Sequence, residues 1–133
     1  MHRPLNKGLL VAGLVIALAA LALAGCDTGG GGSNAPNTIE MGGSSFVGNT
    51  NISITAGQAV TFDDPSSTGG SHHLVTGTDM KFSAETGAPT EFATSNGINF
   101  SPGDSKSITF PTAGTYHITC TIHSAMNATI TVS

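Results

Sequence analysis

The chain has 133 residues, of which 9% are charged, and its four basic and eight acidic residues give a formal net charge of −4. This length suits one small domain. Four basic residues are too few for a nucleic-acid-binding groove, in which clustered Lys and Arg side chains contact phosphates. Two cysteines exclude a disulfide-rich scaffold and a four-thiolate zinc or iron–sulfur site.

The N-terminal segment has the pattern of a bacterial lipoprotein signal. A basic start at residues 2–7 precedes an uncharged apolar run at residues 8–25, which is typical of a secretory signal. The sequence Leu-Ala-Gly-Cys at residues 23–26 resembles a lipobox, whose cysteine is lipidated and becomes the new N-terminus on cleavage. We therefore expect a signal peptide over residues 1–25 and a lipid on Cys26. The alternative is an uncleaved membrane helix, since such a run is just long enough to span a bilayer.

The segment that follows the predicted cleavage site is expected to be a tether. Residues 26–37 are rich in Gly, Ser and Asn, contain little that could be buried, and should behave as a flexible linker. Loss of residues 1–25 leaves two lysines against eight acidic residues, a charge of −6. We expect an exported protein, lipid-anchored on the extracytoplasmic face of a bacterial membrane, with residues 38–133 as its folded domain.

Residues 38–133 show the alternation of β-strands. Apolar side chains recur two residues apart at Ile52/Ile54, Val60/Phe62, Ile108/Phe110, Tyr116/Ile118 and Ile130/Val132. Period 2 places one set of side chains inside and the other outside. Turn-forming residues separate these pairs, and helix is expected for at most one turn, near residues 90–93. The pattern predicts an all-β fold, an antiparallel sandwich or barrel, with residues 80–99 the least defined part.

Cys120 has no evident partner if Cys26 carries a lipid. A disulfide to Cys26, an intermolecular bridge or a buried inert thiol would each account for it. However, His123 and Met126 follow at intervals of three residues, so a thiolate, an imidazole and a thioether lie close together in sequence. Soft sulfur and imidazole ligands favour copper or zinc, and two His, one Cys and a distant axial Met form a blue-copper site. A zinc site would more often use a second thiolate or a carboxylate.

A second imidazole is available at His72 or His73, which follow a Gly-Gly turn at the start of a predicted strand. Strand ends that are distant in sequence can meet at one pole of a sandwich. Period 2 favours His72, because it would share the inward face with Leu74, and His73 is the alternative. Other candidates are assigned to the surface or to packing: His117, Met41 and Met80.

Several short motifs occur together in the sequence from residue 52 onward. They are Ala56-Gly57-x-x-Val60-Thr61-Phe62, Ser71-His72-His73-Leu74-Val75, Phe100-x-Pro102-Gly103, Ile108-x-Phe110 and Gly114-Thr115-Tyr116-x-x-x-Cys120-x-x-His123-x-x-Met126. Over about 80 residues the sequence resembles a cupredoxin of the plastocyanin/amicyanin group. The two-residue gap before Met126 is similar to that of amicyanin. The resemblance implies a Greek-key β-sandwich with one type 1 copper, ligands His72, Cys120 and His123, and an axial Met126.

The sequence departs from the family pattern beside the first ligand. The family usually has Pro-His-Asn-Val there, whereas this chain has Ser71 and His73 in place of the Pro and the Asn. That Asn normally braces the cysteine loop by hydrogen bonding, and an imidazole N–H of His73 is expected to substitute for it. Ile122 and Ser124 occupy loop positions where the family commonly carries Pro.

The resemblance implies a one-electron carrier rather than an enzyme, because a filled four-ligand site leaves no open position for a substrate. We expect a tethered monomer that exchanges electrons with transient redox protein partners through an apolar patch around His123, and that binds no nucleic acid. An extracytoplasmic copper-binding or delivery protein is one alternative. An adhesion sandwich with Cys120 in a disulfide is another.

Overall fold

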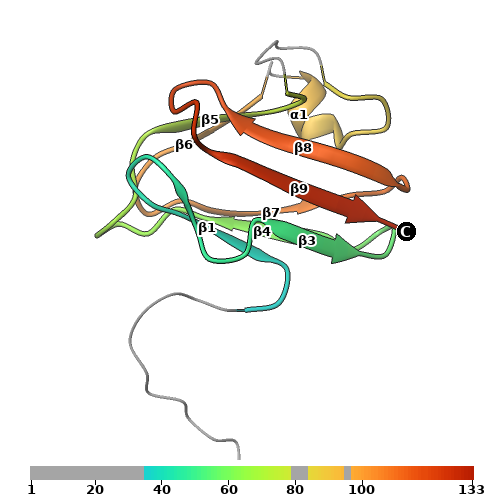
Figure 1. The fold of residues 1–133 in the computed structure, drawn as a ribbon, viewed down its shortest axis with the longest axis horizontal. Coiled ribbons are helices and arrows are strands. Elements are labelled where there is room, and N and C mark those ends of the chain that lie inside the picture. Colours follow the sequence, from blue (N-terminus) through green and yellow to red (C-terminus); the bar gives the residue numbers. More distant parts are fainter. Residues whose placement is uncertain (1–34, 79–83, 95–96) are drawn as a thin grey trace, which may run out of the picture.

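The computed structural model describes residues 35–78, 84–94 and 97–133, which form two β-sheets packed face to face (Figure 1). The elements in chain order are β1 (Thr38–Met41), β2 (Phe46–Val47), β3 (Asn51–Ile54), β4 (Ala59–Asp63), β5 (His72–Thr76), α1 (Thr90–Thr94), β6 (Ile98–Phe100), β7 (Ser105–Thr109), β8 (Gly114–Cys120) and β9 (Asn127–Val132). One sheet has the order β2-β1-β4-β7 and the other β3-β9-β8-β5-β6. The predicted signal peptide and Cys26 lie outside the described residues.

The alternation seen in the sequence is the alternation of burial in the structure. In β3 the side chains of Ile52 and Ile54 are buried while their neighbours are exposed. Every apolar pair on which the strand prediction depended is buried in the space between the sheets. Period 2 therefore identified both the strands and the faces that pack, and the predicted all-β sandwich is confirmed.

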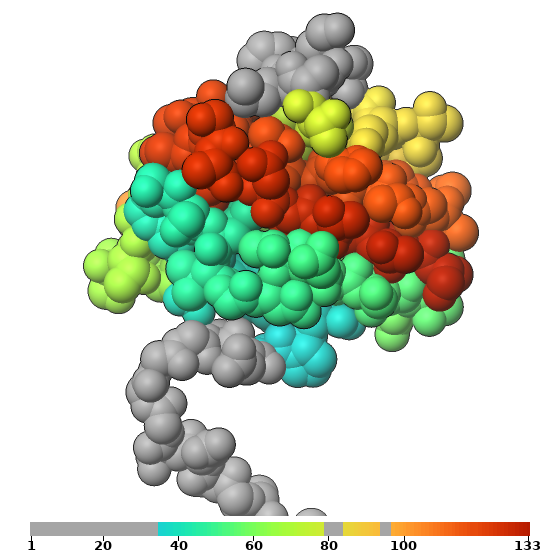
Figure 2. Space-filling model, viewed as in Figure 1, coloured from blue at the N-terminus to red at the C-terminus, as the bar shows by residue number. Residues whose placement is uncertain are grey.

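The expectation of a purely antiparallel sandwich is wrong in detail, because both sheets are mixed. β1 pairs with β4 in parallel, with Ile39 opposite Phe62, and β3 pairs with β9 in parallel, with Ile52 opposite Ile130. Figure 2 shows the green of β3 lying directly against the red of β9. Alternating burial is the same for parallel and antiparallel neighbours, so the sequence pattern carries no information about strand direction.

The predicted single helical turn near residues 90–93 is confirmed as α1. Its Phe92 is buried and packs against Phe62, with ring centroids 6.4 Å apart in a T-shaped arrangement that aromatic pairs favour. No helix among the described residues has the length and apolar character needed to span a membrane.

The sheet that contains β5 and β8 brings two distant parts of the chain to one end of the sandwich. β5 begins at His72, β8 ends at Cys120, and the two strands are antiparallel neighbours with Leu74 opposite Cys120. The start of one strand therefore lies beside the end of the other. The short connection from β8 to β9 is also at this end, so it is here that a site can form.

Candidate metal centre

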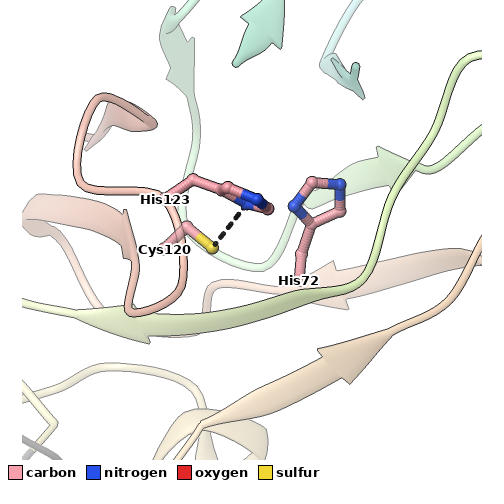
Figure 3. A group of neighbouring side chains, drawn as sticks. All are labelled: His72, Cys120 and His123. Atoms are coloured by element: carbon pink, nitrogen blue, oxygen red, sulfur yellow. Dashed lines mark hydrogen bonds between the residues drawn. The ribbon is translucent and has the colours of Figure 1, made fainter. Parts of the chain in front are cut away.

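Three side chains with metal-binding atoms converge at this end of the sandwich. One donor atom from each of His72, Cys120 and His123 lies within 4.8 Å of the others. In Figure 3 the Cys120 sulfur and one ring nitrogen each of His72 and His123 are turned toward one another. His72 comes from the start of β5, Cys120 from the end of β8 and His123 from the loop between β8 and β9. The structure thus brings together three of the residues predicted from the sequence.

Cys120 is the last inward-facing residue of β8, in series with Tyr116 and Ile118. Its side chain is fully buried and forms no disulfide within the described part of the chain. Its Sγ lies 3.8 Å from Nδ1 of His123, the contact drawn as a dashed line in Figure 3. The neighbouring strands hold the backbone of Cys120, so the sheet fixes the position of the sulfur.

The loop after Cys120 closes on itself through the backbone. The N–H of Met126 donates to the carbonyl of His123 at 3.0 Å, and the N–H of Cys120 donates to the carbonyl of Met126 at 3.1 Å. These bonds set the backbones of the three residues close together. The Met126 side chain is fully buried and belongs to the same apolar core as Cys120. Its burial fits a thioether held at the site, and its role as axial ligand stays a prediction.

His72 and His73 lie on opposite faces of β5. The His72 ring is 1% exposed and belongs to the cluster, as period 2 predicted. His73 is half-buried, and its Nδ1 lies 2.9 Å from the hydroxyl oxygen of Thr121. The backbone N–H of Thr121 also donates to the carbonyl of His73 at 2.9 Å. The expected brace between β5 and the loop after Cys120 is therefore present, with the imidazole of His73 in place of the amide of an Asn.

The sequence from residue 35 onward matches a family of copper proteins. The family described as copper-binding proteins, plastocyanin/azurin family, covers residues 35–133. The chain belongs to this family. Copper is therefore its cofactor, as the sequence predicted, and the cupredoxin assignment is confirmed. No curated protein matches the sequence.

Solved structures that resemble this cupredoxin include amicyanins. An oxidised methionine-to-lysine variant of amicyanin has 17% identity and a TM-score of 0.51, and the match covers 72% of this chain and 80% of that one. The reduced Cu(I) form, at pH 4, of a proline-to-glycine variant has 16% identity and a TM-score of 0.51, over 76% and 85%. Amicyanin from Paracoccus versutus has 17% identity and a TM-score of 0.49, over 72% and 79%. At these identities the likeness to the two variants shows the fold alone.

The donor atoms of this cupredoxin suit a soft metal ion. Neither ring nitrogen of the buried His72 has a hydrogen-bond partner among the described residues, which leaves a nitrogen lone pair free for a metal. Burial lowers the pKa of His72 below its usual value, against the opposing charge of Asp64. The neutral ring that results is the form that binds metals. One sulfur with two imidazoles fits copper.

A buried carboxylate beside this cluster was not identified from the sequence. Oδ1 of Asp64 lies 3.7 Å from Nε2 of His72, and both side chains are completely shielded from solvent. The sequence did contain an indication of its burial, because Asp64 continues the inward series of Val60 and Phe62 beyond the end of β4. An acidic residue on an inward position indicates either a partner or a function.

His117 is not part of the metal-binding cluster, as expected. His117 has a side chain that is 43% exposed, and its Nδ1 lies 2.9 Å from a carboxylate oxygen of Glu85. Met41 is fully buried in the core. Met80 lies outside the described residues. These positions are consistent with the surface and packing roles that the sequence assigned to His117 and Met41.

Proposed function

We propose that this cupredoxin is a membrane-tethered electron carrier whose type 1 copper is held by His72, Cys120 and His123, with Met126 as the axial ligand. The observation that carries the proposal is the convergence of one thiol and two imidazoles at the end of a rigid β-sandwich. Membership of the copper-binding family supports a blue copper electron-transfer protein, since cupredoxins are generally carriers rather than enzymes.

The protein frame would keep the donor atoms in place during electron transfer. Cys120 lies within the ladder formed by β5, β8 and β9, and His72 pairs with Phe100 of β6. The brace between His73 and Thr121 fixes the loop that carries His123. Copper held by His72, Cys120 and His123 would supply the one-electron redox chemistry, as an ion that can be either Cu(II) or Cu(I). A frame held in this way would reorganise little between the two states.

The loop also supplies a surface for partner contact. His123 is half-buried whereas His72 is enclosed, so the ring of His123 would offer the ligand edge nearer to solvent. Ile122, next to it, is 56% exposed, and Ala125 is exposed as well. A small apolar patch around a ligand edge suits a weak encounter of low buried area, which is what a transient redox partner requires.

The proposed membrane attachment rests on the sequence pattern of the N-terminal segment. The lipobox-like Leu-Ala-Gly-Cys would place a lipid on Cys26, and residues 26–37 would link it to the folded domain. Such a tether would hold the carrier on the extracytoplasmic face of a bacterial membrane, close to membrane-bound redox enzymes.

Copper loading of purified protein tests the electron-carrier proposal. We expect an intense thiolate-to-copper absorption band, a reversible one-electron potential, and loss of the band in Cys120→Ser. His72→Gln should also lose the band, while His117→Gln, a matched change at an imidazole outside the site, should keep it. A colourless protein that binds Cu(I) and shows no reversible potential would favour copper delivery instead.

A separate experiment tests the anchor. Cells expressing the full chain are grown with an alkyne-bearing fatty acid, and the label is followed by mass spectrometry. Label is expected on the wild type and on Cys120→Ser, and its absence is expected in Cys26→Ser. A disulfide between Cys26 and Cys120 in the isolated protein would contradict both the anchor and the copper site.

A further inference from the structure

Asp64 is a completely buried carboxylate with little around it to balance its charge. Its side chain is 0% exposed, its Oδ1 accepts the backbone N–H of Gly70 at 3.1 Å, and its Oδ2 has no hydrogen-bond partner among the described residues. A buried charged group is costly unless a positive group or a metal centre compensates it. Because its burial is costly, the Asp64 carboxylate is expected to have a function.

The backbone around Asp64 holds the carboxylate firmly in place. The N–H of Asp64 donates to the carbonyl of Asp104 at 2.8 Å, and the carbonyl of Asp64 accepts from Gly103 at 2.6 Å. The turn from Asp64 to Gly70 wraps around the side chain so closely that a Cβ on Gly69 would lie 1.9 Å from Oδ1. Only glycine fits there, and the turn leads directly into β5 and His72.

The carboxylate is directed at one nitrogen of the His72 ring. Oδ1 lies 3.7 Å from Nε2, which is beyond hydrogen-bonding distance but close enough for a strong electrostatic interaction in a solvent-free site. In Figure 3 one ring nitrogen of His72 faces Cys120 and His123, and the other points away from them. A negative charge beside Nε2 favours a proton on that nitrogen, which leaves the Nδ1 lone pair for the metal. Outer-shell carboxylates act on metal-bound imidazoles in this way.

We propose that Asp64 is a positioning residue for the copper site: it holds His72 as the Nε2–H tautomer and lowers the reduction potential of the copper. The second effect follows from Coulomb's law, because a fixed negative charge stabilises Cu(II) more than Cu(I). This inference rests on the proposed role of His72 as a copper ligand. It adds a residue that lies outside the four-ligand set and that acts through His72.

The backbone of Gly42 is a competing explanation for the tautomer of His72. Like the charge of Asp64, it raises the pKa of the His72 ring. If Gly42 alone set the tautomer, removal of the Asp64 charge would leave the tautomer of His72 unchanged, although the potential would still respond to the lost charge. The two explanations therefore predict different results for one substitution.

The first test is the potential of Asp64→Asn, which removes the charge and keeps the shape. Asp63→Asn is the matched control, because Asp63 is the preceding residue, is only half-buried, and alternation places its side chain on the other face of β4. We expect Asp64→Asn to shift the Cu(I)/Cu(II) equilibrium toward Cu(I) at least about tenfold, or about 59 mV for one electron. Asp63→Asn should shift it less than about threefold, since solvent screens its charge. Equal shifts in the two variants would overturn the proposal.

The second test needs neither copper nor a stable variant. In metal-free wild-type protein at about pH 8, where imidazole is neutral, long-range ¹⁵N–¹H correlation spectra report the tautomer of each histidine. We expect His72 to carry its proton on Nε2, and a proton on Nδ1 would overturn the proposal. Failure of the protein to bind copper would contradict the proposed function, while this measurement would still decide between the two tautomers of His72.

Discussion

The ring of His73 and the side chain of Thr121 are joined across two elements, with Nδ1 of the imidazole 2.9 Å from the hydroxyl oxygen. The backbones of the same residues are also joined, by the Thr121 N–H and the His73 carbonyl at 2.9 Å. Thr121 follows Cys120 directly and His73 follows His72. Two residues that are not in the metal cluster thus connect the two segments that supply it.

Loss of the side-chain bond should therefore weaken the site without removing a ligand. We expect His73→Ala and Thr121→Ala each to lower the free energy of unfolding by about 1 kcal/mol. Copper should also dissociate faster from both variants, because the loop that carries His123 is less constrained. Chemical denaturation and a chelator competition assay measure the two effects.

The conservative change His73→Asn is the control for this brace. An amide can replace the ring as a hydrogen-bond partner of Thr121, so His73→Asn should recover most of the lost stability. The double variant His73→Ala/Thr121→Ala should cost less than the sum of the single variants. Strict additivity would show that the two side chains do not interact.

Much of the metal centre could be predicted from sequence, because its residues are identified by patterns within short stretches of the chain. The spacing of Cys120, His123 and Met126 describes one short loop, and period 2 placed His72 on the inward face of its strand. The brace at His73 came from the family resemblance. The contact between Asp64 and His72 could not be predicted in the same way, because it depends on a turn that folds back over a buried side chain.

The directions of the strands were missed for a related reason. Alternation shows which face of a strand is buried, and it was correct for Ile52 and for Ile130. It does not show that β3 lies parallel to β9. The partner of a strand is decided by how the chain crosses between the two sheets, which is a property of the complete fold.

The hydroxyl of Tyr116 should stabilise the fold without affecting the metal centre. Its side chain is buried, and the hydroxyl lies 2.8 Å from the carbonyl oxygen of Thr112 and 3.0 Å from that of Gly87. Tyr116→Phe leaves these acceptors without the donor, so we expect a loss of about 1–2 kcal/mol in unfolding free energy. The absorption spectrum and the potential of the copper-loaded variant should match those of the wild type. A changed spectrum would show that this end of β8 is coupled to Cys120.

The turn around Asp64 should tolerate no side chain at Gly69. A Cβ there would lie 1.9 Å from Asp64 Oδ1 and 2.5 Å from the carbonyl oxygen of Pro65, so the turn must move. We expect Gly69→Ala to cost about 1–3 kcal/mol of stability. Gly43→Ala is the matched control, since the nearest atom to its Cβ would be 3.9 Å away. Thermal unfolding of the metal-free proteins compares them, and equal midpoints would show that the turn can open without cost.

The stability of the metal-free protein should fall as the pH is lowered, because His72 is buried as a neutral ring. Burial lowers its pKa in the folded protein, whereas in the unfolded chain the ring has its ordinary value of about 6.5. Above the ordinary value the ring is neutral in both states, so it contributes no pH dependence. Below that value the unfolded chain binds a proton that the folded protein does not, and unfolding becomes easier. The loss continues until the lowered pKa is reached.

Urea unfolding of the metal-free protein between about pH 8 and pH 5 measures this effect, and His72→Gln removes its source. The variant keeps a polar side chain of moderate size and has no group that titrates in this range. Its unfolding free energy should therefore decline less steeply with falling pH than that of the wild type. Asp64 and His123 are the charged or titratable groups that act on the ring, and both remain in the variant. Parallel profiles for the two proteins would show that the pH dependence arises elsewhere, and that the buried ring binds a proton in the folded protein as easily as in water.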